Sequence, residues 1–305
     1  MSAPPTPPPS VAVVVVSFNV RDALVACLES LGRYVGIPFE TVVVDNASED
    51  GSAQAARARE PAPRVIANTV NLGFARACNQ GLRATTAPHV LFLNPDATVT
   101  AGAIEVLTAR LDSDPDIGAV GPLTRHPDGT VQVSTGPDLS PAAERRQRRL
   151  VRGVRRRDAE SLREATERHG REHEPDWLSG ACLMARREAL EAVNGFDEGF
   201  FLYEEDADLC RRIRAAGWRV VFTPAAEITH QLGRSMDRAP QRARMEYHRS
   251  HLRYYRKHNG LLARGALRLL LLGRGLGGLA LGALTGNRSR RAESWTLVEL
   301  ALSRA

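Results

Sequence analysis

The sequence is poor in cysteine, and its cysteines form none of the patterns typical of functional cysteine sites. Four cysteines are spread along 305 residues without a C-x-x-C pair. This spacing excludes a zinc ribbon, gives no sign of a disulfide framework and fits a reducing cytoplasm. The chain also lacks a Gly-X-Y period and any repeat of about 20–50 residues, which excludes collagen and solenoid folds.

The first ten residues lack both a basic segment and an apolar stretch. A secretory signal needs both, so we interpret residues 1–10 as a disordered, proline-rich leader. Hydrophobic residues make up 43% of the chain and charged residues 25%, with a formal net charge of +6. This composition excludes a wholly disordered protein, and the length allows one large α/β domain or two smaller ones.

Apolar runs alternate with helical patterns over the first ~120 residues. Residues 11–16 form a continuous apolar, mostly β-branched run, which is typical of a strand buried on both faces of a parallel sheet. The alternation predicts βαβ units and an α/β fold with a doubly wound, mostly parallel sheet. The expected strands are 11–16, 41–44, 64–67, 89–93 and 117–120, and the expected helices are 22–31, 51–59, 74–84 and 101–111.

The pattern is interrupted between residues 137 and 175. Residues 145–157 hold eight arginines and no acidic residue, and we see no sustained apolar stripe. This composition predicts a long, mobile, arginine-rich insertion. A nucleic-acid-binding role is a second hypothesis for the arginine run. The run has no interleaved aromatic residues, however, and supports only nonspecific attraction to phosphate.

Polar residues follow the predicted strands, at the edge where ligands bind in such sheets. Asp45 follows the second strand, and its carboxylate can accept the imide N–H of uracil or thymine, or else cap a helix in a turn. Asp96 comes after the fourth predicted strand, as the last residue of the triplet Asn94-Pro95-Asp96. One or two carboxylates suffice to hold a divalent cation on two phosphates, but the same triplet also suits a simple turn.

The second half, residues 176–258, carries an acidic cluster and a lone histidine. Four carboxylates fall within residues 204–208 at the start of an expected helix, beside aromatic residues. Such mutual repulsion favours a functional role, although acidic residues in a first helical turn also suit the helix dipole. His230 follows a strand near Ser235 and is either a cation ligand or a structural histidine.

Taken in order, seven motifs are similar to those of a known family. They are VAVVVVSFN, VVVDNASEDG, NLGFARACNQG, VLFLNPDA, WLSGACLMARREAL, GFDEGFFLYEEDADLCRRIRAAGW and EITHQLGRS. The series resembles bacterial family 2 glycosyltransferases of the GT-A fold, closest to the branch that includes rhamnosyltransferases of cell-wall and O-antigen assembly. The resemblance covers residues 11–258, with 11–122 as the nucleotide-sugar half and 176–258 as the acceptor half. It implies inverting transfer of a sugar from a nucleoside diphosphate, with Mg²⁺ or Mn²⁺ on the diphosphate.

The resemblance also implies roles for particular residues. Asp206, paired with Glu205, would be the general base, and Asp96 and His230 would hold the metal. Only the last carboxylate of the family's metal-binding motif is present. The donor would be bound by Phe18, which would stack on the base, and by Asn19, Asp45, Asn71, Arg76, Asn79 and Asn94.

The last segment, residues 259–305, is rich in leucine, arginine and glycine. Its longest uncharged stretch has 13 residues, from 275 to 287, which is short of the ~20 that a spanning helix needs. We therefore expect an amphipathic tail on an anionic membrane surface, with a helix packed on the catalytic domain as the alternative. The expected protein is cytoplasmic, peripheral on the inner face of the plasma membrane. It would move L-rhamnose from dTDP-L-rhamnose to a lipid-linked or polymeric glycan, with no specific nucleic-acid partner and an undetermined oligomeric state. A catalytically silent scaffold is the remaining alternative.

Overall fold

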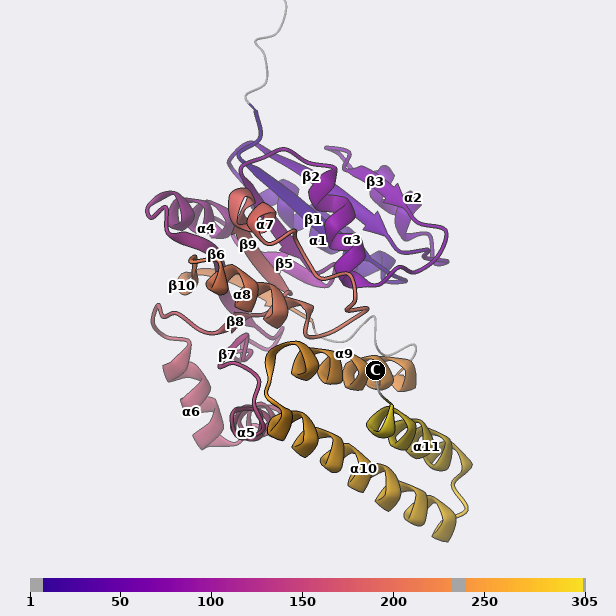
Figure 1. Ribbon diagram of the computed structural model, residues 1–305. Helices are drawn as coiled ribbons and strands as arrows, with labels where there is room; N and C mark the ends of the chain where they lie inside the picture. Colours follow the sequence, from indigo (N-terminus) through magenta and orange to yellow (C-terminus); the bar gives the residue numbers. More distant parts are fainter. Residues whose placement is uncertain (1–7, 232–239, 304–305) are drawn as a thin grey trace, which may run out of the picture.

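The computed structural model describes residues 8–231 and 240–303. Most of the leader and Ser235 lie outside this part of the chain. An eight-stranded sheet forms the centre, in the order β3-β2-β1-β4-β9-β6-β10-β5 (Figure 1). Its strands are β1 (Val11–Ser17), β2 (Phe39–Asp45), β3 (Arg64–Ala67), β4 (His89–Leu93), β5 (Ala97–Val99), β6 (Ile117–Arg125), β9 (Cys182–Arg186) and β10 (Arg219–His230).

The expected mostly parallel sheet is confirmed. β1 is buried along its whole length and pairs in parallel with β2 and β4. Two strands were not predicted: β9 runs antiparallel between β4 and β6, and the short β5 runs antiparallel to β10. β10 is longer than expected because a bulge around Pro224 lets it resume pairing with β6 and reach His230.

Helices cover both faces of the sheet, because the strand residues alternate between two apolar clusters. On one face, Leu24 of α1 and Ile104 of α4 pack against Val13 and its neighbours. On the other, α3 and α8 pack against Val14 and Phe92. α3 lies so close to β1 that a Cβ on Gly81 would stand 2.3 Å from Val14 Cγ1. The helices are α1 (Arg21–Tyr34), α2 (Ser52–Arg57), α3 (Phe74–Arg83), α4 (Ala103–Asp112), α7 (Arg187–Ala192) and α8 (Glu205–Ala215).

The arginine-rich segment is helical, which corrects the expectation of a mobile insertion without an apolar stripe. It forms α5 (Pro141–Arg155) and α6 (Ala159–Arg168), each begun by a side-chain cap, Ser140 and Asp158. Leu150 and Val154 lie four residues apart on α5 and form a small core with Ala165 of α6. This stripe is narrow enough to be hidden among the arginines in the sequence. The segment is flanked by the two-residue strands β7 (Thr135–Gly136) and β8 (Trp177–Leu178).

Three C-terminal helices lie beneath the sheet in Figure 1, namely α9 (Pro240–His258), α10 (Leu261–Leu284) and α11 (Arg288–Leu302). Glycines did not prevent α10 from forming, because three of them face α11. A Cβ on Gly275, Gly278 or Gly282 would stand 2.6, 2.2 or 2.7 Å from an atom of Val298, Ser294 or Arg291. The glycine spacing therefore lets the two helices pack closely as a hairpin.

α10 has two environments along its length. Leu267 and Leu271 are buried in the apolar cluster that also contains Tyr254 and Tyr255 of α9, as expected for a packed helix. Leu262, Leu269 and Leu276 are exposed, Leu262 by 92%. With 24 residues, α10 is the one described helix long and apolar enough to cross a membrane, by length and composition alone. The 13-residue uncharged stretch underestimates the length of this helix, because α10 also includes the arginine-bearing turns before residue 275.

Candidate functional site

The polar residues that follow the parallel strands meet at one edge of the sheet. The register aligns Ser17, the last residue of β1, with Asp45, the last residue of β2. On the other side of β1, Val15 aligns with Leu93 at the end of β4, so Asn94 and Asp96 follow at the same edge. This is where ligands bind in sheets of this type.

Asp45 is 2% exposed, and only one of its carboxylate oxygens is satisfied. The backbone N–H of Ser48 donates to Oδ2 at 3.0 Å, which is the expected turn-capping bond. Oδ1 is buried without a hydrogen-bond partner among the described residues. Leaving a buried carboxylate oxygen unpaired costs free energy. The capping role accounts for Oδ2 only, so Oδ1 remains as an acceptor for a ligand.

The segment after β1 is locked to the Asp45 turn. Asn19 has a left-handed backbone, φ 55°. Its N–H donates to Ser48 Oγ at 2.9 Å, and its Oδ1 accepts from the Glu49 N–H at 2.8 Å. These bonds fix the segment that carries Phe18, a partly exposed residue, beside the Asp45 turn.

Asp96 and His230 are brought together from positions 134 residues apart. The antiparallel pairing of β5 with β10 aligns His230 with Ala97, the residue after Asp96. Asp96 Oδ1 and His230 Nε2 are 3.1 Å apart, and both side chains are buried. Asn94 Nδ2 lies 3.3 Å from the same ring nitrogen.

This pair passes a test for a divalent cation. Adjacent ligand atoms on one octahedral cation lie about 3 Å apart, so the observed separation suits shared ligation as well as a hydrogen bond. The other ring nitrogen of His230, Nδ1, faces the side-chain amide of Gln132 at 3.2 Å. A Gln132 oxygen that accepts the Nδ1 proton leaves Nε2 free to ligate. Among the described residues, no group of three or more His, Cys, Asp or Glu side chains is arranged to hold a metal ion, so phosphate oxygens and water would have to supply the other ligands.

Asp206 lies in the first turn of α8 and is held by backbone donors. Gly180 N–H donates to Oδ2 and Ala207 N–H to Oδ1, both at 2.8 Å. Burial raises the pKa of Asp206 to about 6, and the nearby charge of Glu204 adds to that rise, although the backbone hydrogen bonds oppose it. Burial and the neighbouring Asp206 raise the pKa of Glu205 well above its usual value. A carboxylate with a pKa near 6 is well matched to accept a proton near neutral pH.

The turn before α8 adopts an uncommon conformation. Tyr203 and Glu204 both have left-handed backbones, with φ 73° and 63°. Each such residue costs about 1–3 kcal/mol, and such strain is concentrated at functional sites. The turn is therefore held by its surroundings.

A single peptide segment links the Asp96–His230 pair to Asp206. Asn94 N–H donates to Ala181 O at 2.9 Å, and the preceding residue, Gly180, donates to Asp206. A Cβ on Gly180 would stand 3.4 Å from Asp206 Cβ. The structure therefore brings the two parts of the candidate site against the same short strand connection.

The three residues expected from α3 and its approach have structural partners. Asn79 is buried, and its amide bonds the backbone of Phe196 in both directions and also donates to Glu198. Arg76 pairs with Glu198 at 3.3 Å. Asn71 accepts a hydrogen bond from Gly73 N–H. The contacts of Asn79 and Arg76 tie α3 to the loop before α8. Among the described residues, none of the three side chains is hydrogen-bonded or ion-paired to Asp45 or Asp96.

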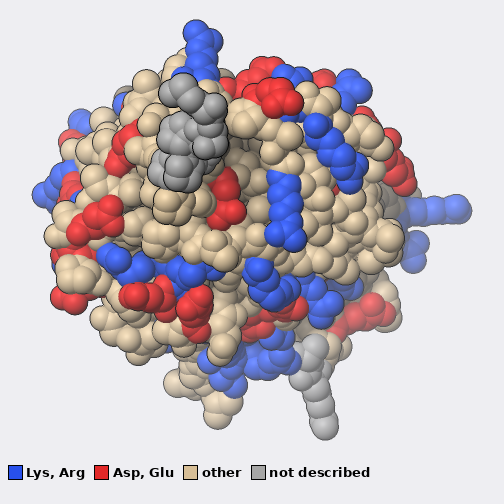
Figure 2. Space-filling view, turned by 90° about the horizontal axis from the view of Figure 1, so that it is seen from above, with Lys and Arg blue, Asp and Glu red and all other residues tan. Residues whose placement is uncertain are grey.

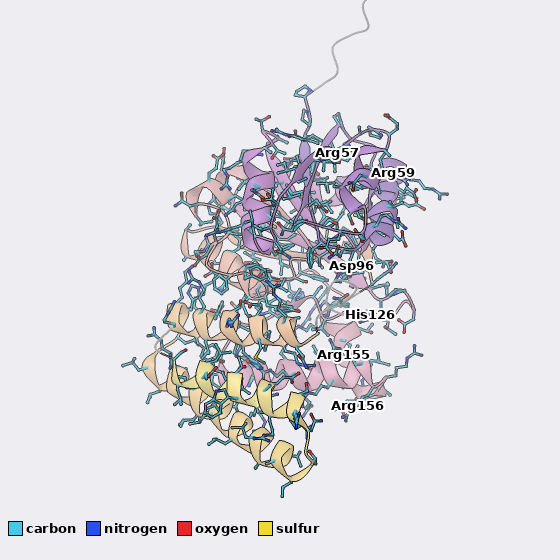
Figure 3. All side chains as sticks on the ribbon, turned by 90° about the vertical axis from the view of Figure 1, so that its right-hand side faces the viewer. Arg57, Arg59, Asp96, His126, Arg155 and Arg156 are labelled. Carbon is cyan, nitrogen blue, oxygen red and sulfur yellow. The ribbon has the colours of Figure 1, made fainter. Side chains whose placement is uncertain are left out.

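Sequence reasoning missed Gln132 and His126, because neither stands in a recognisable motif. Burial lowers the pKa of His126, and the nearby His230 and Arg155 contribute to that shift. In Figure 3, Asp96, His126, Arg155 and Arg156 follow one another down the same side of the molecule. The end of α5 therefore places positive charge next to the candidate cation site.

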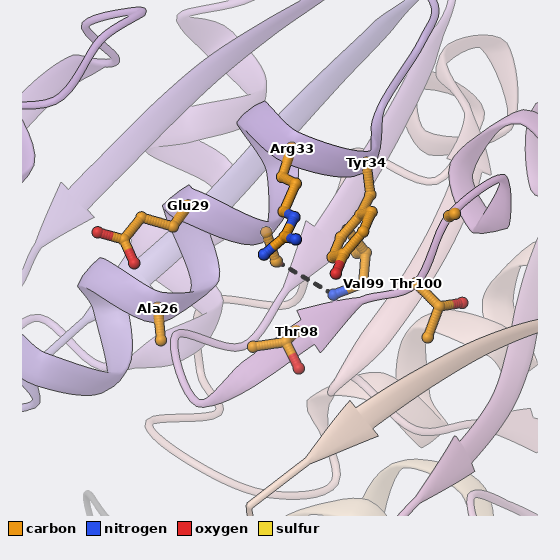
Figure 4. A pocket seen from close by; sticks show the side chains of 9 residues that line it. Ala26, Glu29, Arg33, Tyr34, Thr98, Val99 and Thr100 are labelled. Atoms are coloured by element: carbon orange, nitrogen blue, oxygen red, sulfur yellow. Dashed lines mark hydrogen bonds between the residues drawn. The ribbon is translucent and has the colours of Figure 1, made fainter.

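Two other surfaces show no link to this site. A pocket of about 490 Å³ lies between α1 and β5 and contains none of the candidate residues (Figure 4). Its lining includes Glu29, Arg33, Tyr34 and Thr98. On the face shown in Figure 2, at the end of the molecule away from α10 and α11, acidic and basic side chains are interspersed. That face offers no single-sign field for a nucleic acid.

Comparison with known proteins decides the family. Residues 7–255 match the family described as "Glycosyltransferase like family 2". The chain belongs to glycosyltransferase family 2. It is also 34% identical over 258 residues to the N-acetylglucosaminyl-diphospho-decaprenol L-rhamnosyltransferase of Mycobacterium tuberculosis, covering 78% of this chain and 81% of that protein. A shorter match, 44% identical over 55 residues, links it to rhamnosyltransferase WbbL of Escherichia coli, with 18% of this chain and 21% of that one covered.

Solved structures show the fold of this glycosyltransferase. The mannosyltransferase PcManGT from Pyrobaculum calidifontis, in complex with GDP-Man and Mn²⁺, superposes with a TM-score of 0.59 at 20% identity, over 97% of this chain and 87% of that one. The expected GT-A type of α/β fold is thus confirmed.

Proposed function

We propose that this glycosyltransferase moves L-rhamnose from dTDP-L-rhamnose to a lipid-linked glycan of the cell envelope, with inversion at the transferred carbon. The support for sugar and acceptor is the name of the Mycobacterium tuberculosis relative, which acts with L-rhamnose on an N-acetylglucosaminyl-diphospho-decaprenol. The relative's similarity extends over most of both chains. The support for the chemistry comes from the side chains at the sheet edge.

The donor base is bound at the Asp45 turn. Asp45 Oδ1 is buried and unpaired among the described residues, so it can accept the imide N–H of thymine. Phe18 stands beside it on the segment that Asn19 fixes, and its ring provides a stacking surface for the base.

The donor diphosphate extends toward Asp96 and His230, which would hold a divalent cation, Mg²⁺ or Mn²⁺. Such a cation stabilises the negative charge that develops on the leaving diphosphate. The chain's own contribution is to orient the ligands: Gln132 sets the His230 tautomer, and the β5–β10 pairing holds Asp96 opposite it. Arg155, near His126, adds positive charge on the same side.

Asp206 is the general base, and its placement is the observation that carries the proposal. Its carboxylate is held by Gly180, one residue from the peptide that bonds Asn94, so proton acceptor and cation site meet at one connection. Asp206 takes the proton of the acceptor hydroxyl while that oxygen bonds to the sugar carbon. The carbon–oxygen bond to the diphosphate breaks, and its electron pair leaves with dTDP.

We infer that this enzyme lies on the inner face of the plasma membrane, and two features of the C-terminal hairpin and α5 support this. The exposed leucines of α10 supply apolar surface. Exposed arginines of α5 supply charge for anionic lipid, each worth about 1 kcal/mol at such a surface. Within the described residues, no ion pair is formed by five of them or by Arg156, the C-cap of the helix; the five are Arg145, Arg146, Arg149, Arg152 and Arg155.

A donor screen tests the proposal. Purified protein is heated with dTDP-L-rhamnose, UDP-glucose, UDP-N-acetylglucosamine or GDP-mannose, each with and without Mn²⁺ or Mg²⁺. We expect the largest rise in unfolding temperature with dTDP-L-rhamnose plus metal, because a ligand stabilises the state that binds it. NMR of the transferred sugar should show the opposite anomeric configuration to the donor. A GDP or UDP sugar that stabilises better would contradict the donor assignment, and retained configuration would contradict the displacement.

A further inference from the structure

A buried histidine on α9 joins two carboxylates from different parts of the chain. His251 is 1% exposed. Its Nδ1 lies 2.9 Å from Glu204 Oε1, and its Nε2 lies 3.1 Å from Glu144 Oε2. A neutral imidazole carries one N–H, so facing a carboxylate with each nitrogen favours the doubly protonated, positively charged ring. The two carboxylates raise the pKa of His251 to about 9, against the lowering effect of burial.

The carboxylate on α5 is itself held in place. Arg148 Nη2 lies 2.6 Å from Glu144 Oε2, and the Tyr255 hydroxyl donates to Glu144 Oε1. Tyr247 stacks on the His251 ring at 5.4 Å between centroids, with 20° between the planes. His251 is therefore fixed from the α5 side as well as by its own helix.

The carboxylate on the other side of His251 belongs to the strained turn before α8. Ser250, the residue before His251, donates its hydroxyl proton to Leu202 O at 2.7 Å. Two successive residues of α9 thus hold residues 202 and 204, at either end of a turn in which Tyr203 and Glu204 have left-handed backbones. Glu205 and Asp206 follow directly, and Glu204 O accepts the Asp208 N–H that begins the helix.

We propose that His251 is a positioning residue for Asp206. Held as a cation between Glu144 and Glu204, it fixes the turn that starts α8 and offsets the Glu204 charge beside the Asp206 carboxylate. This inference rests on the proposed role of Asp206 as the base. According to this inference, α5 and α9 contribute to the reaction by holding the turn before α8, and this contribution needs no contact with the substrate.

The charges around Asp206 predict the direction in which its pKa changes when His251 is replaced. The Glu204 charge raises the pKa of Asp206. Without the His251 cation, that effect is no longer offset, and Asp206 must lose its proton at a higher pH. The titratable and charged groups around the two residues are Glu144 and Arg148 of α5, Glu204 and Glu205 at the start of α8, Cys210 of α8, Tyr247, His248 and Tyr255 of α9, and Arg274 of α10.

The test is the pH dependence of kcat for the full-length enzyme with metal, donor and a soluble acceptor. In His251→Gln, we expect the acidic limb to move up by about 0.5–1 pH unit. We also expect kcat to fall about tenfold with little change in the donor KM, because none of the residues proposed to bind the donor lies on α9. In Glu204→Gln the limb should move down, and the double variant should return toward the wild-type limb.

His248→Gln is the matched control. His248 is also buried on α9, one turn before His251, and burial lowers its pKa to about 4, so it carries no charge near neutral pH. Its replacement should leave the acidic limb in place. Thermal unfolding of each variant shows whether the fold survives. If His251→Gln does not fold, Glu144→Gln decides, because it keeps His251 but removes one of its two partners and should lower kcat with the donor KM unchanged.

An acidic limb and a kcat that are unchanged in a folded His251→Gln variant would overturn the inference. If His251→Gln does not fold, a wild-type kcat in Glu144→Gln would overturn the inference. Asp206→Asn separates this failure from failure of the proposed function. If Asp206→Asn is inactive at every pH while His251→Gln behaves like wild type, only the inference falls. If Asp206→Asn is active, the base assignment itself falls.

Discussion

Replacement of Asp206 by Asn should make the protein more stable near neutral pH. The folded protein raises the pKa of Asp206 from 3.8 to about 6. Below about pH 3 the carboxyl is mostly protonated in both the folded and unfolded states. As pH rises, the unfolded state loses the proton first, so wild-type stability falls until the folded carboxyl also ionises near pH 6. The destabilisation reaches about 3 kcal/mol at pH 7.5 and about 1.6 kcal/mol at pH 5.

The Asn side chain removes this destabilisation at a fixed cost. Gly180 and Ala207 both donate to the carboxylate, and an amide has one acceptor oxygen, so one hydrogen bond worth about 1 kcal/mol is lost. The net gain at pH 7.5 is about 2 kcal/mol. The sharper quantity is the difference between the two pH values, about 1.4 kcal/mol, because the hydrogen-bond loss cancels. Urea unfolding of wild type and variant at pH 5 and 7.5 measures it. A stability difference that does not grow with pH would refute the raised pKa and with it the argument for a base tuned by burial.

Further predictions follow from other parts of the structure. Asp45→Asn should weaken dTDP binding about tenfold or more by calorimetry, because the acceptor for the base N–H loses its charge; unchanged affinity would remove Asp45 from the base pocket. Asp96→Asn should abolish the effect of Mn²⁺ on donor affinity, whereas Asp112→Asn, at the opposite ends of the strands, should keep it; equal metal effects in both would contradict the cation site. Gly278→Leu should lower the unfolding free energy by about 1–3 kcal/mol through its clash with Ser294, and Gly277→Leu, whose Cβ meets nothing within 4 Å, should not. Replacing exposed Leu262, Leu269 and Leu276 with Gln should reduce sedimentation with anionic vesicles at least tenfold, and undiminished sedimentation would exclude α10 from membrane contact.

The first half of the fold is predictable because its signals are local. An apolar run such as residues 11–16 specifies a strand buried on both faces, and helices α1, α2 and α3 separate the first four strands. β9 could not be predicted in this way. Its place between β4 and β6 depends on contacts with residues about 65–95 positions earlier in the chain, which no local pattern records. α5 was hidden for a different reason, since two buried apolar residues suffice to dock it among many arginines.

The candidate site divides in the same way. Asp45, Asp96 and Asp206 stand directly after strands or at a helix start, so their edge of the sheet follows from topology. Their partners do not. Gln132 and His251 approach from a loop and from α9, 98 and 47 residues away from His230 and Glu204. Asn79 and Arg76 show the opposite case: a motif predicts them in the donor pocket, and in the structure their side chains bond the loop near Glu198.

A comparison of rhamnosyl transfer by the wild type and by Asp206→Asn shows whether this enzyme uses Asp206 as its base. Full-length protein with Mn²⁺ is given labelled dTDP-L-rhamnose and an N-acetylglucosaminyl-diphospho-polyprenol in anionic vesicles, and labelled lipid is counted. We expect transfer by wild type and by the control Asp112→Asn. For Asp206→Asn we expect a rate lower by about 100-fold or more with nearly unchanged donor affinity, because only the proton acceptor is lost. Rhamnosyl transfer by Asp206→Asn at the wild-type rate would contradict the assignment of Asp206 as the base. A wild type that transfers no rhamnose, but binds another nucleotide sugar and transfers its sugar, would contradict the assignment of the donor.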